Sequence, residues 1–171
     1  MTLFDKLFTA DERLSARLRV AEKPGLIRTA AVMLAHSGDS PYWIAGFLLV
    51  LWRGSSFWQN HARLDLIGIA ATAAVIQLIK WIVRRPRPQG EWGQGYRKID
   101  PHSFPSGHAA RAALLATLAV FLGPPEWFFL LLIWAPLVAL ARVAMGVHYL
   151  SDILAGAACG AVCGAIVVIA F

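Results

Sequence analysis

The chain is poor in charge. Only 15% of its 171 residues are Asp, Glu, Lys or Arg, and 58% are hydrophobic, whereas a soluble domain carries about a quarter charged residues. Residues 153–171 contain no charged side chain, and roughly 20 apolar residues are enough to span a bilayer core. This shortage argues against an ordinary soluble domain and indicates an integral membrane protein.

Cysteine is also scarce. Cys159 and Cys163 are the only two, and they lie one helical turn apart in the apolar C-terminal segment. Because no second pair of ligands accompanies them, we expect packing residues and neither a disulfide nor a metal site.

Acidic residues are outnumbered by basic ones, 10 to 16, which gives a net charge of +6. The basic residues gather in the N-terminal segment and within residues 80–98, beside apolar segments and not as a stripe over a soluble surface. We therefore expect contacts with lipid head groups and no nucleic-acid partner. The mixture of acids and bases at the N-terminus predicts no secretory signal peptide.

The pattern predicts a single all-α domain over residues 1–171, a polytopic membrane bundle of about six transmembrane helices. Residues 1–21 alternate apolar and charged side chains as an amphipathic interfacial helix does. The helical core, residues 24–171, is expected to contain two short apolar segments within 25–52, helices over 61–83, 106–122 and 127–144, a polar loop over 87–105, and a last helix after residue 149.

Three glycines in the last helix, Gly156, Gly160 and Gly164, recur every four residues. Small residues at this spacing let helices approach closely. We expect internal packing, with a homo-oligomer possible but not indicated.

Polar clusters fall at residues 80–88, 104–108 and 141–152. Since successive membrane helices alternate in direction, the end of one helix, the start of the next and the start of the last must share one side of the bilayer. The topology therefore predicts that residues 80–152 supply one site from three distant segments.

In the first cluster, Lys80 and Arg87 are seven residues apart and would share a helix face if the helix continued past Pro86. A lysine point charge and an arginine fork suit phosphate oxygens. The alternative is that these cations only reach the head groups, the role we expect for Arg84 and Arg85.

In the second cluster, Ser106 suits a helix N-cap, Gly107 lets an anion approach the backbone, and His108 can pass a proton near neutral pH. A capped helix with an incidental histidine is the alternative reading.

In the third cluster, His148 and Asp152 are neighbours at i and i+4 on a helix. A carboxylate bonded to one ring nitrogen leaves the other nitrogen as a nucleophile, and Arg142 adds a further cation. The alternative is a structural ion pair. The three clusters together describe phosphoryl transfer by positioning and charge.

These clusters resemble the three-part signature of the type 2 phosphatidic acid phosphatase family, the lipid phosphate phosphatases. The first motif is matched by Lys80, Arg87 and Pro88, and the second, Pro-Ser-Gly-His, by residues 105–108. The third is matched by Arg142, His148 and Asp152, with Ala141 where serine is usual.

The resemblance implies an enzyme without metal or cofactor, whose active site lies at the extracytoplasmic face of a membrane, for this chain a bacterial cytoplasmic membrane. It implies that His148 attacks phosphorus and becomes phosphohistidine, that Asp152 orients it, and that His108 protonates the leaving oxygen. The phosphoryl oxygens would be held by Lys80, Arg87, Arg142, Ser106 and Gly107.

The context of His108, with Arg111 three residues later, resembles the branch that hydrolyses polyisoprenoid diphosphates, and Arg111 would contact a second phosphate. The alternatives are a phosphatidate or phosphatidylglycerol phosphate phosphatase, and a non-catalytic lipid-phosphate-binding membrane protein. The soluble vanadate haloperoxidases share the motif, but this hydropathy argues against them.

Overall fold

The computed structural model describes residues 3–90 and 93–171, and eight α-helices make up the regular structure of these residues. They are α1 (Leu3–Arg17), α2 (Leu26–Ser37), α3 (Ser40–Arg53), α4 (Ser56–Val83), α5 (Gly93–Ile99), α6 (Gly107–Leu122), α7 (Pro125–Ala144) and α8 (Leu150–Ala170).

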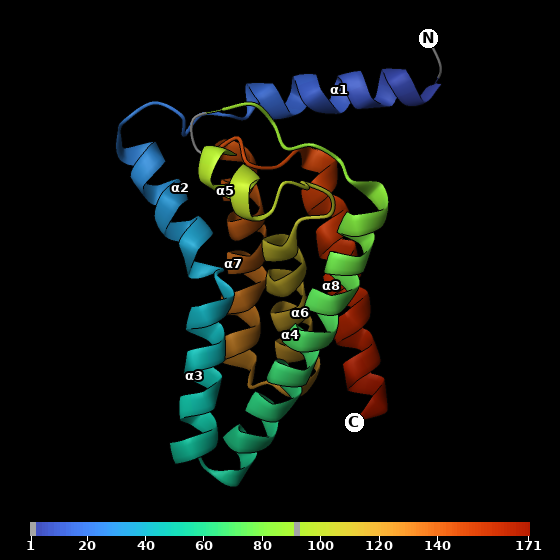
Figure 1. The fold of residues 1–171 in the computed structure, drawn as a ribbon. Coiled ribbons are helices and arrows are strands. Elements are labelled where there is room, and N and C mark those ends of the chain that lie inside the picture. Colours follow the sequence, from blue (N-terminus) through green and yellow to red (C-terminus); the bar gives the residue numbers. More distant parts are fainter. Residues whose placement is uncertain (1–2, 91–92) are drawn as a thin grey trace.

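Six of these helices, α2, α3, α4, α6, α7 and α8, form a bundle, and α1 lies across one end of it (Figure 1). In the described residues α4, α7 and α8 are each long and apolar enough to cross a membrane. The shorter α2 and α3 follow one another along the same side of the bundle (Figure 1). The prediction of an all-helical membrane bundle is confirmed.

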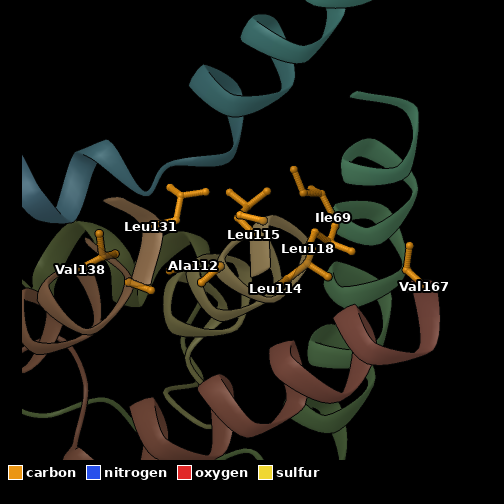
Figure 2. Close-up of a cluster of buried hydrophobic side chains, with 11 residues drawn as sticks. Ile69, Ala112, Leu114, Leu115, Leu118, Leu131, Val138 and Val167 are labelled. Carbon is orange, nitrogen blue, oxygen red and sulfur yellow. The ribbon is translucent and has the colours of Figure 1, made fainter. Parts of the chain in front are cut away.

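Helix α6 packs against α4, α7 and α8. Its Leu114, Leu115 and Leu118 meet Ile69 of α4 and Val138 of α7 in the largest buried cluster (Figure 2). Many large apolar side chains on the outer faces of the long helices stay exposed, as lipid-facing side chains do.

The glycine stripe of α8 packs directly against α6. A Cβ at Gly160 would overlap the carbonyl oxygen of Ala110, and one at Gly156 would overlap that of Ser106. Only glycine permits so close an approach of two backbones. The predicted internal packing of this stripe is confirmed.

Helix α4 ends at Val83, as predicted for the helix over residues 61–83, and Arg84 after it adopts a left-handed conformation, with φ of 51°. Because the helix does not continue past Pro86, Lys80 and Arg87 do not share a helix face. The expectation of a polar loop is wrong in one part, because the segment contains the short helix α5. Its glycines are poor helix formers, and its polar side chains give no apolar pattern that would predict a helix.

Candidate functional site

A cavity of about 210 Å³ lies at the end of the bundle where α4 ends and α6 begins. It is lined by Ile69, Thr72, Ala73, Ile76, Gln77, Lys80, Arg87, Asp100, Gly107, His108, Arg111, Arg142 and His148. All predicted site residues except Ser106 and Asp152 are in this lining. The three polar clusters therefore converge as the topology predicted.

The two predicted site residues outside the lining lie directly behind it, and both are fully buried. Ser106 caps α6, since its Oγ accepts a hydrogen bond from the amide of Ala109 at 3.5 Å. The amide of Ser106 donates to the carbonyl oxygen of Asp152 at 2.9 Å. This bond ties the start of α6 to the start of α8.

The carboxylate of Asp100 lies between the two cations of the first cluster. Its Oδ2 accepts hydrogen bonds from Lys80 Nζ and, at 2.8 Å, from Arg87 Nη2, while its carbonyl oxygen accepts from Arg87 Nε at 2.7 Å. Burial would raise the pKa of Asp100, but its hydrogen bond with Lys80 and the charges of Lys80 and Arg87 bring it below the ordinary value. Lys80 and Arg87 thus meet around one anion although their helix does not continue.

His148 lies in the joint between α7 and α8, where Gly146 makes the reversal with φ of 68°. Arg87 Nη1 is 3.1 Å from His148 Nε2. A guanidinium can only donate, so Nε2 is unprotonated and the ring proton is on Nδ1. Asp152 Oδ2 lies 3.4 Å from that Nδ1, longer than a hydrogen bond but close enough to orient the ring electrostatically.

Burial and the surrounding cations, first Arg87 and then Arg142 and Lys80, hold the pKa of His148 well below 6.5. The ring is therefore neutral at physiological pH, with a lone pair on Nε2 facing the cavity cations. A neutral, oriented imidazole is what a histidine nucleophile requires.

Asp152 also accepts hydrogen bonds from a backbone amide and from an arginine. Its Oδ2 accepts from the amide of Tyr149 at 2.8 Å and its Oδ1 from Arg85 Nη1 at 2.9 Å. The expectation that Arg85 only reaches the head groups is wrong, because its side chain is 9% exposed and pairs with both Asp152 and Asp11. Arg85 is far in sequence from both carboxylates, so no residue spacing could have predicted this role.

His108 has a carboxylate partner that the sequence did not indicate. His108 Nε2 is 2.6 Å from Asp39 Oδ1, and Asp39 Oδ2 is 2.8 Å from His36 Nδ1. Asp39 stands in the joint between α2 and α3, within residues 25–52, where we predicted only two short apolar segments. Arg111 donates to the carbonyl oxygen of Gly38 in the same joint.

A larger cavity of about 800 Å³ lies between α3, α4, α6 and α7, with Trp43, Phe47, Trp58 and Trp127 in its wall. It follows the same faces of α4 and α6 as the smaller cavity. On α4 the lining passes from Asp65 to Ile69, and on α6 from Leu115 to Arg111, each step being one helical turn. The cations and histidines of the predicted site line the smaller cavity. The larger cavity has a mostly apolar wall that also includes Arg53, His61 and Asp65, and it lies one helical turn further along α4 and α6.

Within residues 3–90 and 93–171 no group of three or more His, Cys, Asp or Glu side chains is placed to hold a metal ion. The chemistry that this arrangement can perform with its own residues is anion binding by cations, nucleophilic attack by a neutral imidazole, and proton transfer by a second imidazole.

Comparison with known proteins gives a consistent set of similarities. The family model described as the PAP2 superfamily matches residues 63–171. The decaprenylphosphoryl-5-phosphoribose phosphatase of Mycobacterium tuberculosis is 33% identical over 152 residues, covering 86% of this chain and 82% of that protein. The lipid A 1-phosphatase of Rhizobium etli is 25% identical over 174 residues, covering 85% and 72% respectively.

Two crystal structures have a similar fold. A transmembrane PAP2-type phosphatidylglycerolphosphate phosphatase from Bacillus subtilis superposes with a TM-score of 0.75 at 22% identity, covering 95% of this chain and 84% of that one. Aquifex aeolicus LpxE superposes with a TM-score of 0.72 at 22% identity, covering 90% and 93%.

Proposed function

Because this chain belongs to the PAP2 superfamily, we propose that it removes a phosphate group from a polyisoprenoid lipid. The protein is a membrane phosphatase of lipid phosphates, as its relatives are. One observation carries the proposal: a cavity lined by cations and two histidines lies one helical turn along α4 and α6 from a larger, mostly apolar cavity.

In the first half of the reaction, His148 Nε2 attacks phosphorus. The P–N bond forms as the bond from phosphorus to the leaving oxygen breaks, and His108 donates the proton that this oxygen takes up. Asp152 keeps the proton of His148 on Nδ1 and stabilises the positive charge that the ring gains. Water then attacks the phosphohistidine, His108 takes its proton, and inorganic phosphate leaves.

The cations supply most of the electrostatic stabilisation. Lys80, Arg87 and Arg142 face the cavity, and the start of α6 at Ser106 and Gly107 adds a helix N-terminus, where backbone amides favour an anion. Charge developing on the phosphoryl oxygens is stabilised by groups that are already in place. A substrate phosphate takes the position between Lys80 and Arg87 from the Asp100 carboxylate.

The lipid tail would follow the apolar cavity along α4 and α6. Its aromatic and aliphatic wall suits an unsaturated hydrocarbon, and its extent over several helical turns suits a long chain. The relative with 33% identity acts, by its name, on a decaprenyl lipid. This relationship favours a polyisoprenoid substrate. A glycerophospholipid substrate is supported only by the similar fold of the phosphatidylglycerolphosphate phosphatase.

A diphosphate is the favoured form of the reacting group. Arg111 lines the cavity one helical turn beyond His108, where it can contact a second phosphate. In an Arg111→Ala variant, hydrolysis of a polyisoprenyl diphosphate should fall relative to that of the monophosphate. An unchanged ratio would contradict the assignment.

The protein would lie in a bacterial cytoplasmic membrane with this site at the extracytoplasmic face. Arg53 and Arg63 lie near the opposite end of the bundle, but α1 and the segment after α4 bring more basic residues to the site end. The proposed orientation therefore follows from the family resemblance and not from the charge distribution.

The substrate is tested with a panel of four lipids in detergent with EDTA present: polyisoprenyl diphosphate, polyisoprenyl monophosphate, phosphatidate and phosphatidylglycerol phosphate. We expect the highest kcat/KM for a polyisoprenyl substrate and no effect of EDTA. A preference for either glycerophospholipid would overturn the substrate class, and inactivation by EDTA would overturn the metal-free mechanism.

A further inference from the structure

Helix α1 turns polar side chains toward the bundle. Ser15 is fully buried and the side chain of Asp11 is only 13% exposed, while Phe8 and Leu14 are about half exposed. In a helix held to its neighbours by apolar burial alone, the apolar side chains would be buried and the polar ones exposed. The contacts of α1 with the bundle are therefore specific polar ones.

Two of these contacts satisfy the start of α8. Asp11 Oδ1 accepts from the amide of Ser151 at 3.0 Å, and Ser15 Oγ accepts from the amide of Leu150 at 2.9 Å. The first amides of a helix have no partner within that helix. Helix α1 thus caps α8 from outside, immediately after the joint that carries His148.

A third contact reaches the carboxylate behind the nucleophile. Arg85 donates from Nη2 to Asp11 Oδ2 at 2.8 Å and from Nη1 to Asp152 Oδ1 at 2.9 Å. Its guanidinium lies over the ring of Tyr149, 3.9 Å from the centroid. The planar fork of arginine can hold two carboxylates in a fixed relation, which lysine cannot.

We propose that Asp11 and Arg85 are positioning residues for phosphoryl transfer, so that α1 is part of the catalytic apparatus. Arg85 holds one oxygen of Asp152 and leaves the other facing His148 Nδ1; Asp11 fixes Arg85. Asp11 and Asp152 are 141 residues apart, so only the docking of α1 on the bundle creates this chain of contacts. The inference rests on the proposed function, because it assigns its effect to the nucleophile of that reaction.

The test compares Asp11→Asn with Glu12→Gln in the full chain in detergent, with polyisoprenyl diphosphate as substrate. Asparagine keeps an oxygen to cap Ser151 but loses the charge that pairs with Arg85, so the fold should be retained. Glu12 is an exposed carboxylate on the same helix and is the matched control. The wild-type rate tests the proposed function, and the ratio of variant to wild type tests the positioning role.

We expect Asp11→Asn to lower kcat about tenfold, by analogy with the 10- to 100-fold loss when a residue that orients a metal-ligating histidine is removed. The KM should change less than about twofold and the melting temperature by a few degrees, while Glu12→Gln should match the wild type. A wild-type kcat for Asp11→Asn, or a loss no larger than the fraction of unfolded protein, would overturn the proposal.

A double-mutant cycle separates positioning from general stabilisation. If Asp11 acts through Arg85, adding Asp11→Asn to an Arg85→Gln variant should lower kcat no further. Losses that multiply would contradict the proposal. Should Asp11→Asn fail to fold, Ser15→Ala provides the test, with a two- to threefold fall in kcat expected and an unchanged kcat contradicting it.

Discussion

The two histidines of the site have opposite surroundings. His148 and its carboxylate Asp152 are 2% and 0% exposed, and Arg85 and α1 cover them from behind. His108 and its carboxylate Asp39 are 17% and 25% exposed, and Asp39 contacts the still more exposed His36. The His148 ring is therefore enclosed, whereas the His108 ring is linked to the exterior through Asp39 and His36.

This difference suits two different tasks. A nucleophile has to remain neutral and oriented, which enclosure and surrounding cations favour. A proton donor has to be reprotonated in every turnover, which a series of hydrogen-bonded side chains leading to the exterior favours. In the proposed mechanism, the covalent step at His148 and the proton-transfer step at His108 would therefore be separated in space.

The largest effect should come from removing the enclosed histidine. We expect His148→Ala to lower kcat about 10⁴-fold or more, because the other imidazole of the cavity, His108, is held by Asp39 as the proton donor, and removal of a nucleophile has effects of this size. Phosphate release by the purified variant measures it, with the melting temperature confirming that the bundle is intact. Residual activity above one-hundredth of wild type would contradict the assignment.

The effect of removing His108 should depend on the leaving group of the substrate. We expect His108→Gln to slow hydrolysis of a lipid alkyl monophosphate about 10²- to 10³-fold, the usual range for a general acid. Hydrolysis of p-nitrophenyl phosphate should slow much less, because p-nitrophenolate leaves without a proton. Equal losses on both substrates would show that His108 does not protonate the leaving oxygen.

Removing the charge of Asp39, the carboxylate partner of His108, should cause a smaller loss of activity. Asp39→Asn keeps the shape of the joint between α2 and α3 but weakens the charge partner of His108, and kcat should fall about tenfold. His36→Gln, one contact further out, should have a weaker effect. A stronger effect of His36→Gln than of Asp39→Asn would contradict the proposed order of contacts, in which His108 is linked to Asp39 and Asp39 to His36.

The smallest effect should appear in the pH profile. Burial and Arg87 lower the pKa of His148, so the nucleophile stays neutral as pH falls and its protonation cannot reduce the rate near pH 6.5. In the His108→Gln variant, where the other site histidine is absent, kcat at saturating substrate should stay flat from pH 8 to about pH 6. A single-proton decline with a midpoint near 6.5 would show that His148 is not enclosed as described.

The sequence was sufficient for the residues that lie in motifs and for their convergence. Lys80, His108 and His148 meet because helices alternate in direction, and hydropathy locates those helices. Asp39, Asp100 and Asp11 were not predictable in the same way. Each lies outside the three clusters, on a connection or on α1, and its position at the site follows from how these segments dock on the bundle.

Arg85 illustrates the limit in a single residue. Its neighbours in sequence suggest a head-group contact, and only the left-handed turn at Arg84 and the docking of α1 place it between two carboxylates. Spacing rules describe residues on one helix, and here the relevant distances are between helices.

The central claim is that His148 Nε2 becomes bonded to phosphorus. Rapid quenching of the enzyme with a polyisoprenyl monophosphate carrying ³²P tests it most directly. We predict a labelled protein whose phosphate is stable in alkali and lost in acid, as a P–N bond requires, with the label on the peptide that contains His148. Steady turnover with no labelled enzyme, or with the label on a different peptide, would contradict the account.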